Sequence, residues 1–358
     1  MINNSVKWLS MALFNNKSLI AFFEPLIQMI SKNFTVNRYR AKVMEIRQES
    51  KSVYTLRLQV SRFWKGFNAG QFIELIVEKN GTRYSRYFSI SSPPELFKSH
   101  RVIELTIQKQ SNGRITPWLF ESTTVGQYLN ISAAKGEFYI QNKTKAKLFI
   151  AAGTGITPFR SILAEFCSYV DVHLLYYARN SSHLFSHELA EINKLYKNIK
   201  VDFINSNDQG RFSLDHLETY CPDYKKRESY ICGPEEMIES IKQLLIENSV
   251  KEDCIKYEYF GVKPIKNLKI DTTGTVSFEH SSLKINSKKG SQKTLLQLAE
   301  SKGLNPITGC RMGICHQCIC QKRQGVVYNT LTQSFSDTGF EEVQLCVSVP
   351  VGNVSINL

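Results

Sequence analysis

The chain has 358 residues, a formal net charge of +13 at pH 7, 42% hydrophobic residues and 22% charged residues. At roughly 100–200 residues per domain, this length predicts two or three domains, and the composition excludes a disordered or collagen-like chain. Four of the nine cysteines fall between Cys310 and Cys320. An odd number of cysteines clustered in this way indicates metal binding in a reducing compartment and excludes a secreted disulfide scaffold.

The excess of positive charge is spread along the chain, because no run of five or more Lys or Arg residues occurs. We therefore expect no nucleic-acid binding. A basic balance can also reflect attraction to a membrane surface or to an acidic protein partner, but the densest groups, at Lys143–Lys147 and Lys225–Arg227, are expected to be solvated turns.

Residues 1–38 form an apolar, basic extension that is interrupted near Asn15 and Pro25. A span of about 18 uncharged apolar residues is missing, and so is the pattern of a signal peptide. We expect two short amphipathic helices that either pack on the body of the protein or touch a membrane or a membrane-bound partner. The expected location is the cytoplasm, and membrane contact would place the chain peripherally on the inner face of the membrane.

Residues 39–143 contain short segments of alternating polarity, separated by turns that bear Gly, Asn or Pro. Strands at this spacing predict an antiparallel β-barrel. The segments include Val53–Val60, Phe72–Val77 and Val102–Ile107.

Residues 144–261 alternate between short apolar strands and helical segments, which predicts βαβ units and an α/β domain with a parallel sheet. A helix is expected at Phe159–Phe166. The expected strands are Leu148–Ala152, Val172–Tyr177, Ile199–Ile204 and Tyr230–Cys232.

Residues 262–272 have the character of a linker, and residues 273–358 predict a third, α+β domain. It begins with a hairpin of Thr275–Phe278 and Leu283–Asn286, and a helix follows around Lys293–Ser301. The chain is therefore expected to be a multi-domain protein.

The cysteine cluster is the strongest chemical signal in the chain. Cys310, Cys315 and Cys318 have the spacing C-x4-C-x2-C, and Cys346 follows after 27 further residues. This is the spacing of plant-type [2Fe–2S] centres, so these four thiolates are the predicted cluster ligands. We expect Cys346 on a strand, Val343–Val349, which would anchor the ligand loop to the domain core.

The alternative at this site is structural zinc. Zinc sites with four cysteines usually pair two short Cys-x2–4-Cys knuckles, whereas here three cysteines share one loop. The nearby Cys320 is expected to be a buried thiol that does not bind metal.

With these motifs, residues 40–358 resemble the ferredoxin–NADP⁺ reductase superfamily followed by a plant-type ferredoxin. The order of a flavin domain, a nucleotide domain and a ferredoxin is similar to that of reductases of the phenylacetyl-CoA epoxidase type. It is also similar to that of reductases serving membrane fatty-acid desaturases. The resemblance implies a β-grasp fold for the third domain.

The flavin motif of this superfamily, Arg-x-Tyr-Ser, is matched by Arg86-Tyr87-Phe88-Ser89. The resemblance implies that Arg86 pairs with the flavin phosphate, where a guanidinium offers bidentate hydrogen bonds. It also implies that Ser89 lies near N5 of the flavin ring. Phe88 replaces the usual Tyr, which preserves stacking and removes a hydroxyl.

A second flavin element, Gly113–Thr116, matches the family's Gly-x-x-Ser phosphate turn with Thr in place of Ser. It opens a helical turn, whose N-terminal amides can hold phosphate. FAD is expected over FMN because it is commoner in the resembling families. The predicted flavin-binding residues are Arg86, Tyr87, Phe88, Ser89, Lys109, Gly113, Arg114, Ile115 and Thr116.

A glycine turn, Gly153-Thr-Gly-Ile-Thr-Pro158, separates a buried strand from a helix, where glycine permits backbone contact with pyrophosphate. The segment Cys232–Met237 matches the family's C-G-P-x-x-M, whose cysteine lies beside the nicotinamide. The predicted nucleotide-binding residues in these two motifs are Gly153, Thr154, Gly155, Thr157, Pro158, Cys232, Gly233, Pro234 and Met237.

Two arginines bear on the choice of nucleotide. Arg179 follows the Val172–Tyr177 strand and Arg211 follows a later one, so the two could embrace a 2′-phosphate. No acid ends the first strand, although Asp208 lies nearby in sequence. NADPH is therefore favoured over NADH as the electron donor.

The segment Tyr257–Phe260 matches the family's E-x-F, and the resemblance implies that Glu258 and Phe260 lie near the isoalloxazine edge. Ser89, Cys232 and Glu258 are thus the predicted catalytic residues. Hydride transfer needs no strong acid or base, so they are expected to shape the pocket in which the nicotinamide is positioned.

The predicted function is electron transfer from NAD(P)H through FAD and a [2Fe–2S] cluster to an oxygenase-type protein, because a flavin links hydride transfer to one-electron transfer. The favoured acceptor is a membrane fatty-acid desaturase with a di-iron centre, on account of residues 1–38. One alternative is the reductase of a soluble oxygenase of aromatic compounds. Another is an iron–sulfur redox sensor or a binding module.

Overall fold

The computed structural model describes two compact units. One contains the described residues up to 77 and from 88 to 258, and the other contains residues 78–87 and those from 259 onwards. The expectations for residues 1–37 and for the linker up to residue 271 lie outside the described part. The described residues are 38–79, 82–110, 115–180, 182–260, 272–288, 291–309, 311, 313, 316–332 and 334–358.

The first sheet is antiparallel and has the strand order β4-β3-β6-β1-β2-β5, as the sequence predicts. Ile90, directly after β4, forms a bridge with Leu105 of β5, so the two outermost strands of this order meet. Leu56 and Leu58 of β2 are fully buried inside. The elements are β1 (Tyr39–Ser50), β2 (Val53–Val60), β3 (Phe72–Lys79), β4 (Thr82–Ser89), α3 (Pro94–His100), β5 (Val102–Gln108), α4 (Thr116–Ser122) and β6 (Tyr128–Ile131).

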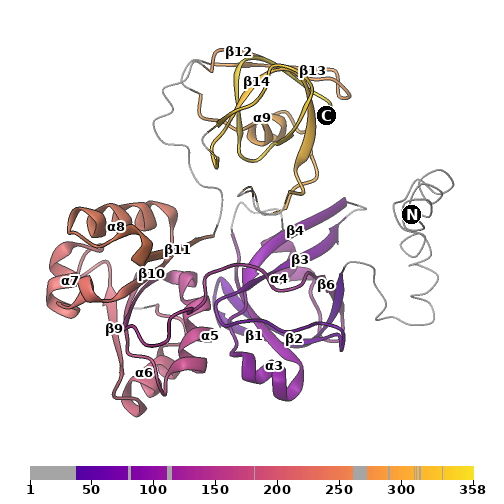
Figure 1. Cartoon of the computed structure of the whole chain (residues 1–358). Helices are drawn as coiled ribbons and strands as arrows, with labels where there is room; N and C mark the ends of the chain where they lie inside the picture. The colour runs from indigo at the N-terminus through magenta and orange to yellow at the C-terminus, as the bar shows by residue number, and fades with distance from the viewer. Residues whose placement is uncertain are drawn as a thin grey trace, which may run out of the picture. The chain divides into compact units, whose positions relative to one another are not determined.

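The second sheet has the order β11-β10-β7-β8-β9, and β10, β7, β8 and β9 run parallel, which confirms the α/β prediction. Helices surround it (Figure 1), so its central strands are buried along their length, as parallel sheets require. Its strands are β7 (Lys147–Ala152), β8 (Val172–Ala178), β9 (Ile199–Asn205), β10 (Glu228–Gly233) and β11 (Ile255–Tyr259). Its helices are α5 (Ile156–Phe166), α6 (Ser186–Leu195), α7 (Leu214–Tyr220) and α8 (Glu235–Glu247), with short 3₁₀ turns η1 (Gly153–Gly155), η2 (Tyr224–Lys226) and η3 (Glu252–Cys254).

An aromatic cluster joins these two sheets within the first unit. Phe138, from the segment that leads out of the antiparallel sheet, contacts Phe159 of α5 and Tyr230 of β10 with ring centroids 5.6 and 5.4 Å away. Phe149 of β7 stacks on Phe159 at 4.7 Å. The hydrophobic core around the parallel sheet therefore extends to Val53, Ala69 and Phe138 of the antiparallel domain.

The third sheet, in the second unit, has the order β13-β12-β17-β14-β15, and β16 pairs with β14. Its β12 is antiparallel to β13 and parallel to β17, and the buried face of α9 joins the core of the sheet. The expected hairpin and helix are confirmed, while the β-grasp assignment stays a prediction. The elements are β12 (Gly274–Phe278), β13 (Leu283–Ser287), α9 (Leu295–Ser301), β14 (Ile319–Asn329), β15 (Ser334–Phe335), β16 (Glu341–Gln344) and β17 (Ser348–Ile356).

The expectation of one continuous strand over Val343–Val349 is wrong. The strand β16 ends at Gln344, β17 begins at Ser348, and the residues between them, including Cys346, form a turn. The amide of Leu345 donates a hydrogen bond to the carbonyl of Cys318 at 3.0 Å, one residue beyond the last pair of the β14–β16 ladder, and its carbonyl accepts one from the amide of Leu296 in α9.

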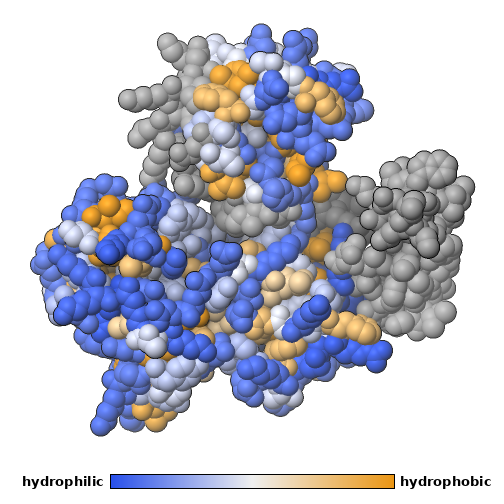
Figure 2. Space-filling view, in the orientation of Figure 1, coloured by the Kyte–Doolittle hydropathy of each residue, from blue (hydrophilic) through white to orange (hydrophobic). Residues whose placement is uncertain are grey.

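The surface of the first unit that faces the viewer in Figure 2 is largely hydrophilic, with scattered apolar residues. Several large apolar side chains of the second unit are exposed, among them Ile307, Phe335 and Phe340 at 76%, 58% and 66%. Within the described part of the chain, no helix has the length and apolar character needed to span a membrane.

Candidate active site

Two of the predicted catalytic side chains meet in the first unit. Ser89, at the end of β4, is 4% exposed, and its Oγ donates a hydrogen bond to Oε2 of Glu258 at 3.0 Å. Glu258 lies in β11, 169 positions further along the chain. Folding thus brings the end of a barrel strand to the edge strand of the parallel sheet.

The carboxyl group of Glu258 holds its proton unusually tightly. Burial raises its pKa from the ordinary value of 4.5 to about 8, and the hydrogen bond from Ser89 opposes this rise. Although Glu258 keeps partial solvent exposure, its carboxyl lies deep enough that burial is the dominant influence. Near neutral pH this carboxyl is therefore mostly uncharged.

Cys232 completes the predicted catalytic set at the C-terminal end of β10. Its side chain is fully buried, and burial raises the pKa of the thiol well above its ordinary value, with a further contribution from the nearby Glu258. The thiol therefore stays protonated, so it can pack against a ligand but is a poor nucleophile.

The predicted glycine turn packs directly against Cys232. A Cβ on Gly155 would lie 2.2 Å from the carbonyl oxygen of Cys232, so only glycine fits there. Gly153 has φ of +54° with open space on the side of its absent Cβ, and its carbonyl accepts a hydrogen bond from Tyr176 at 3.0 Å. The Oγ1 of Thr157 donates to the carbonyl of Thr154 at 2.9 Å. This turn offers open backbone at a helix N-terminus, which fits a pyrophosphate.

The helix after this turn begins earlier than the sequence predicts. It starts at Ile156 instead of Phe159, so Thr157 and Pro158 lie in its first turn. Proline is accommodated there because the first amides of a helix have no intrahelical partner.

The other half of the Cys232–Met237 motif opens α8. Gly233 ends β10, and Pro234 is the residue before α8. A Cβ on Gly233 would lie 3.6 Å from Sδ of Met237, and the amide of Met237 donates to the carbonyl of Pro234 at 3.0 Å. These residues therefore form one compact strand-to-helix turn beside the glycine turn.

The predicted flavin-phosphate turn is described only in part, because Gly113 and Arg114 lie outside the described residues. Ile115 is the residue before α4, and the Oγ1 of Thr116 accepts a hydrogen bond from the amide of Gln110 at 3.0 Å. The ammonium of Lys109 pairs with Glu121 at 3.0 Å.

The Arg-x-Tyr-Ser match lies on β4. An Nη1 group of Arg86 donates to the carbonyl of Ser85 at 2.7 Å, and Tyr87 and Phe88 are partly exposed. Phe260, the aromatic residue of the E-x-F match, is 45% exposed directly after β11.

The two arginines proposed for nucleotide choice are exposed on loops that follow adjacent parallel strands. Arg179 follows β8, and Arg211 belongs to the loop after β9. The loops are joined by a hydrogen bond from Nδ2 of Asn207 to Oδ1 of Asn180. Asp208 accepts a hydrogen bond from Nδ2 of Asn205.

Two of the four predicted cluster ligands belong to the described residues. Cys318 and Cys346 are 3% and 2% exposed, and the hydrogen bond from Leu345 to the carbonyl of Cys318 holds their segments together. The side chain of Gln344 donates to the carbonyl of Gly313 at 2.9 Å. Two buried thiols on joined segments fit the donor set of an iron–sulfur cluster.

The other two predicted ligands, Cys310 and Cys315, lie outside the described residues. Without them, the described residues contain no group of three or more His, Cys, Asp or Glu side chains arranged to hold a metal. Three of the described residues between positions 310 and 318, Arg311, Gly313 and His316, have left-handed backbone, with φ of 61°, 76° and 58°.

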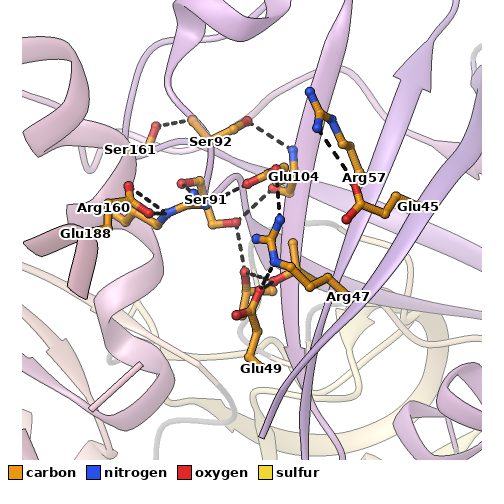
Figure 3. Close-up of polar contacts among 12 residues, drawn as sticks. Glu45, Arg47, Glu49, Arg57, Ser91, Ser92, Glu104, Arg160, Ser161 and Glu188 are labelled. Atoms are coloured by element: carbon orange, nitrogen blue, oxygen red, sulfur yellow. Dashed lines mark hydrogen bonds and ion pairs between the residues drawn. The ribbon is translucent and has the colours of Figure 1, made fainter. Parts of the chain in front are cut away.

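Sequence reasoning missed a buried polar cluster beside these motifs, which Figure 3 shows. Its centre is Arg160 in α5, which forms ion pairs with Glu104 and Glu188. The available signal was an arginine within the otherwise apolar start of a helix, one turn after Thr157.

Known protein families match both halves of the first unit. Residues 40–140 match the oxidoreductase FAD-binding domain, and residues 149–243 match the oxidoreductase NAD-binding domain. The chain is therefore an oxidoreductase with FAD- and NAD(P)H-binding domains, consistent with an electron-transfer enzyme of the ferredoxin reductase type.

Relatives of similar length share about a quarter of their residues with this chain. An NADPH oxidoreductase of Mycobacterium tuberculosis is 25% identical over 331 residues, which cover 91% of this chain and 86% of the relative. A glycine betaine monooxygenase reductase subunit of Chromohalobacter salexigens is 25% identical over 372 residues, covering 94% and 98%.

A solved structure of phthalate dioxygenase reductase, described as a modular structure for electron transfer from pyridine nucleotides to [2Fe–2S], is also similar. It matches with a TM-score of 0.61 and 18% identity, and the match covers 90% of this chain and 98% of that one. The likeness establishes the fold, a ferredoxin–NADP⁺ reductase-like pair of an antiparallel FAD domain and a parallel NAD domain.

The raised pKa of Glu258 predicts a pH-dependent stability difference between wild type and Glu258→Gln. Between the ordinary pKa of 4.5 and about 8, the unfolded carboxyl ionises while the folded one stays protonated. Wild type should therefore lose stability relative to Glu258→Gln as pH rises through this window, by at most about 1.4 kcal/mol per pH unit. Urea unfolding at several pH values measures the difference.

The matched control is Glu252→Gln, which removes an exposed carboxylate from the neighbouring 3₁₀ turn. Its stability difference from wild type should stay level across the same pH range. A level difference for Glu258→Gln as well would contradict the burial of that carboxyl.

Proposed function

We propose that this oxidoreductase transfers electrons from NAD(P)H through FAD to a [2Fe–2S] cluster, and from there to an oxygenase-type protein. The observation that carries the proposal is the convergence of Ser89, Cys232 and Glu258 next to the glycine turn at Gly155. These segments come from both the FAD-binding and the NAD-binding domain. A pocket assembled from both domains is what hydride transfer between their ligands requires.

In this proposal the three side chains position the reactants and do not react themselves. Ser89 holds the carboxyl of Glu258 in place, and the protonated carboxyl keeps the pocket uncharged near neutral pH. The buried thiol of Cys232 provides a neutral packing surface. Catalysis of this kind depends on holding two ligands at the correct distance and angle.

The other predicted flavin and nucleotide residues are proposed to bind the ends of these ligands. Arg86 and the turn that ends at Thr116 would hold the flavin phosphate. The exposed backbone at Gly153, at the start of the Gly153–Gly155 turn, would hold the nucleotide pyrophosphate, in accord with the open space beside it. Bound FAD would supply the chemistry that accepts two electrons together and releases them singly.

The cluster is proposed to be held by Cys310, Cys315, Cys318 and Cys346. Support comes from their spacing and from the joined, buried segments of the two that are described. A cluster-containing relative in the fold comparison agrees with this proposal. A redox sensor would bear the same cluster but would turn over NAD(P)H negligibly, so steady-state oxidation with an artificial acceptor separates the two functions.

For the electron acceptor, we propose an oxygenase component. The similar glycine betaine monooxygenase reductase subunit and phthalate dioxygenase reductase, both named for oxygenases, support this class. A membrane fatty-acid desaturase remains our specific candidate, on the basis of the apolar, basic residues 1–38. In that case the protein would be cytoplasmic and would contact the inner face of the membrane peripherally.

The cluster proposal predicts that Cys346→Ser separates two activities. Reduction of cytochrome c, which depends on the cluster, should fall by roughly 100-fold per bound flavin, because a ligand is lost. Reduction of ferricyanide, which accepts electrons directly from the flavin, should stay within about twofold of wild type. Steady-state assays with NADPH and each acceptor measure both rates.

The matched control for this experiment is Cys320→Ser. Cys320 lies on β14, two residues after Cys318, and its Sγ is 3.3 Å from the carbonyl oxygen of Asn357. Both activities should be retained in this variant. An equal loss of both activities in Cys346→Ser would contradict the proposed order of electron transfer.

The choice of NADPH predicts a selective effect of Arg179→Ala and Arg211→Ala. Each should raise KM for NADPH by about tenfold, since a charge-assisted hydrogen bond to phosphate contributes about 1.5–3 kcal/mol. KM for NADH, which lacks the 2′-phosphate, should hardly change. Lys194→Ala, an exposed lysine of α6, serves as control. Equal effects on both nucleotides would refute selection through these arginines.

The desaturase proposal predicts that removal of residues 1–38 uncouples the reductase from a membrane acceptor. Cosedimentation with membrane vesicles and electron delivery to a membrane desaturase should both fall severalfold, because an amphipathic segment binds through its buried apolar area. Ferricyanide reduction should be unaffected. Unchanged sedimentation together with unchanged coupling would favour a soluble oxygenase as acceptor.

A further inference from the structure

The helix that follows the glycine turn carries a buried arginine with two carboxylate partners. The Nε of Arg160 donates to both oxygens of Glu188, at 3.0 and 2.8 Å, and its Nη1 donates to Oε2 of Glu104 at 2.7 Å. Its guanidinium also lies over the ring of Phe185, 4.4 Å from the ring centroid. The residue is 9% exposed, so this cation is held by protein groups on several sides.

A buried guanidinium with two carboxylate partners is stable only when all three groups keep their relative positions. Burial alone would lower the pKa of Arg160, but Glu188 and Glu104 raise it overall, so the charge is kept. A buried charge that lost one partner would stay desolvated and uncompensated, which is strongly unfavourable. The network therefore resists displacement of its members.

The partners of Arg160 and its neighbour lie in both domains of the first unit (Figure 3). Glu188 belongs to α6 of the NAD-binding domain, whereas Glu104 belongs to β5 of the antiparallel sheet. Arg160 also donates to the carbonyl of Ser91 at 3.3 Å, and the Oγ of Ser161 donates to the carbonyl of Ser92 at 2.6 Å. Two consecutive residues of α5 thus donate hydrogen bonds to the carbonyls of two consecutive residues of the antiparallel domain, Ser91 and Ser92.

The segment Ser91–Ser92 begins two residues after Ser89, and further hydrogen bonds to Glu104 of β5 fix its position. The amide and hydroxyl of Ser91 both donate to the carbonyl of Glu104, at 2.9 and 3.1 Å, and the amide of Glu104 donates to Oγ of Ser92 at 3.0 Å. On its other side, the carboxylate of Glu104 lies 3.9 Å from Nη1 of Arg47 on β1. Movement of Arg160 would therefore be transmitted to the end of β4.

We propose that Arg160 is a positioning residue for hydride transfer, which fixes the start of α5 against the segment that follows Ser89. Arg160 lies one helical turn after Thr157, and its barrel partner Ser91 lies two residues after Ser89. The network thus sets the distance between the nicotinamide side and the flavin side of the pocket. This role rests on the proposed function, because it presupposes hydride transfer in that pocket. Misplacement of reactants by about 1 Å can lower a rate by about 100-fold.

The experiment compares Arg160→Met, Arg160→Lys and Arg227→Met in the flavin-loaded protein. Arg227 is a matched control: its side chain has the same 11% exposure as that of Arg160, and it also pairs with two acids. Its partners Asp171 and Asp223 both lie in the NAD-binding half, at 2.8 and 2.9 Å. Anaerobic stopped-flow measures the rate of flavin reduction per bound flavin at saturating NADPH. Flavin content and melting temperature are measured in parallel.

Arg160→Met should reduce this rate at least about tenfold, and Arg160→Lys should restore part of it, because a cation remains. Arg227→Met should keep the rate within about twofold of wild type even where its melting temperature falls. A wild-type rate in Arg160→Met, or an equal loss in both methionine variants, would overturn the proposal. Where Arg160→Met fails to fold, Glu188→Gln replaces it.

Glu188 suits this second test because its side chain is 37% exposed and tolerates a neutral replacement. The variant should reduce the flavin severalfold more slowly, and a wild-type rate would count against the positioning role. Failure of the inference is distinguishable from failure of the proposed function. If the proposed function is wrong, neither NADPH nor NADH would reduce the flavin of the wild-type protein.

Discussion

The ion pair of Arg160 with Glu104 is the constraint on which the geometry of the first unit depends. It joins a helix of the parallel sheet to a strand of the antiparallel sheet, at a distance of 2.7 Å. The aromatic contacts of Phe138 with Phe159 and Tyr230 bury apolar area between the same two sheets, but they are not directional. A charge held by hydrogen bonds adds direction to that burial. Together they keep the ends of β4, β7 and β10 close to one another.

The protonation of Glu258 and Cys232 follows from the closeness of these strand ends. Burial accounts for both the raised pKa of Glu258 and that of Cys232, so two groups that could be charged are neutral near pH 7. A neutral pocket suits the transfer of a hydride, where positioning matters more than proton exchange. The close packing of Gly155 on the carbonyl of Cys232 shows why the two motifs need small residues. A side chain at Gly155 would push the glycine turn away from the strand end that carries Cys232.

In the second unit, backbone hydrogen bonds bring together the segments of two predicted cluster ligands. The turn that carries Cys346 is held to Cys318 by the amide of Leu345, so strand pairing between β14 and β16 brings two predicted ligands together. Arg311, Gly313 and His316, which lie between the predicted ligand positions 310 and 318, have left-handed backbone.

The sequence by itself determined the two sheets of the first unit, because period-two alternation and βαβ order depend on local patterning. It also indicated the motif segments of the pocket and the cysteine spacing, since glycines and thiols in a fixed order carry their chemistry locally. Tertiary structure alone decided the pairing of Ser89 with Glu258, the raised pKa of that carboxyl, and the turn at Cys346. It alone revealed Arg160 with its partners in two domains. These features depend on burial and on contacts between residues far apart in the chain, which no local pattern records.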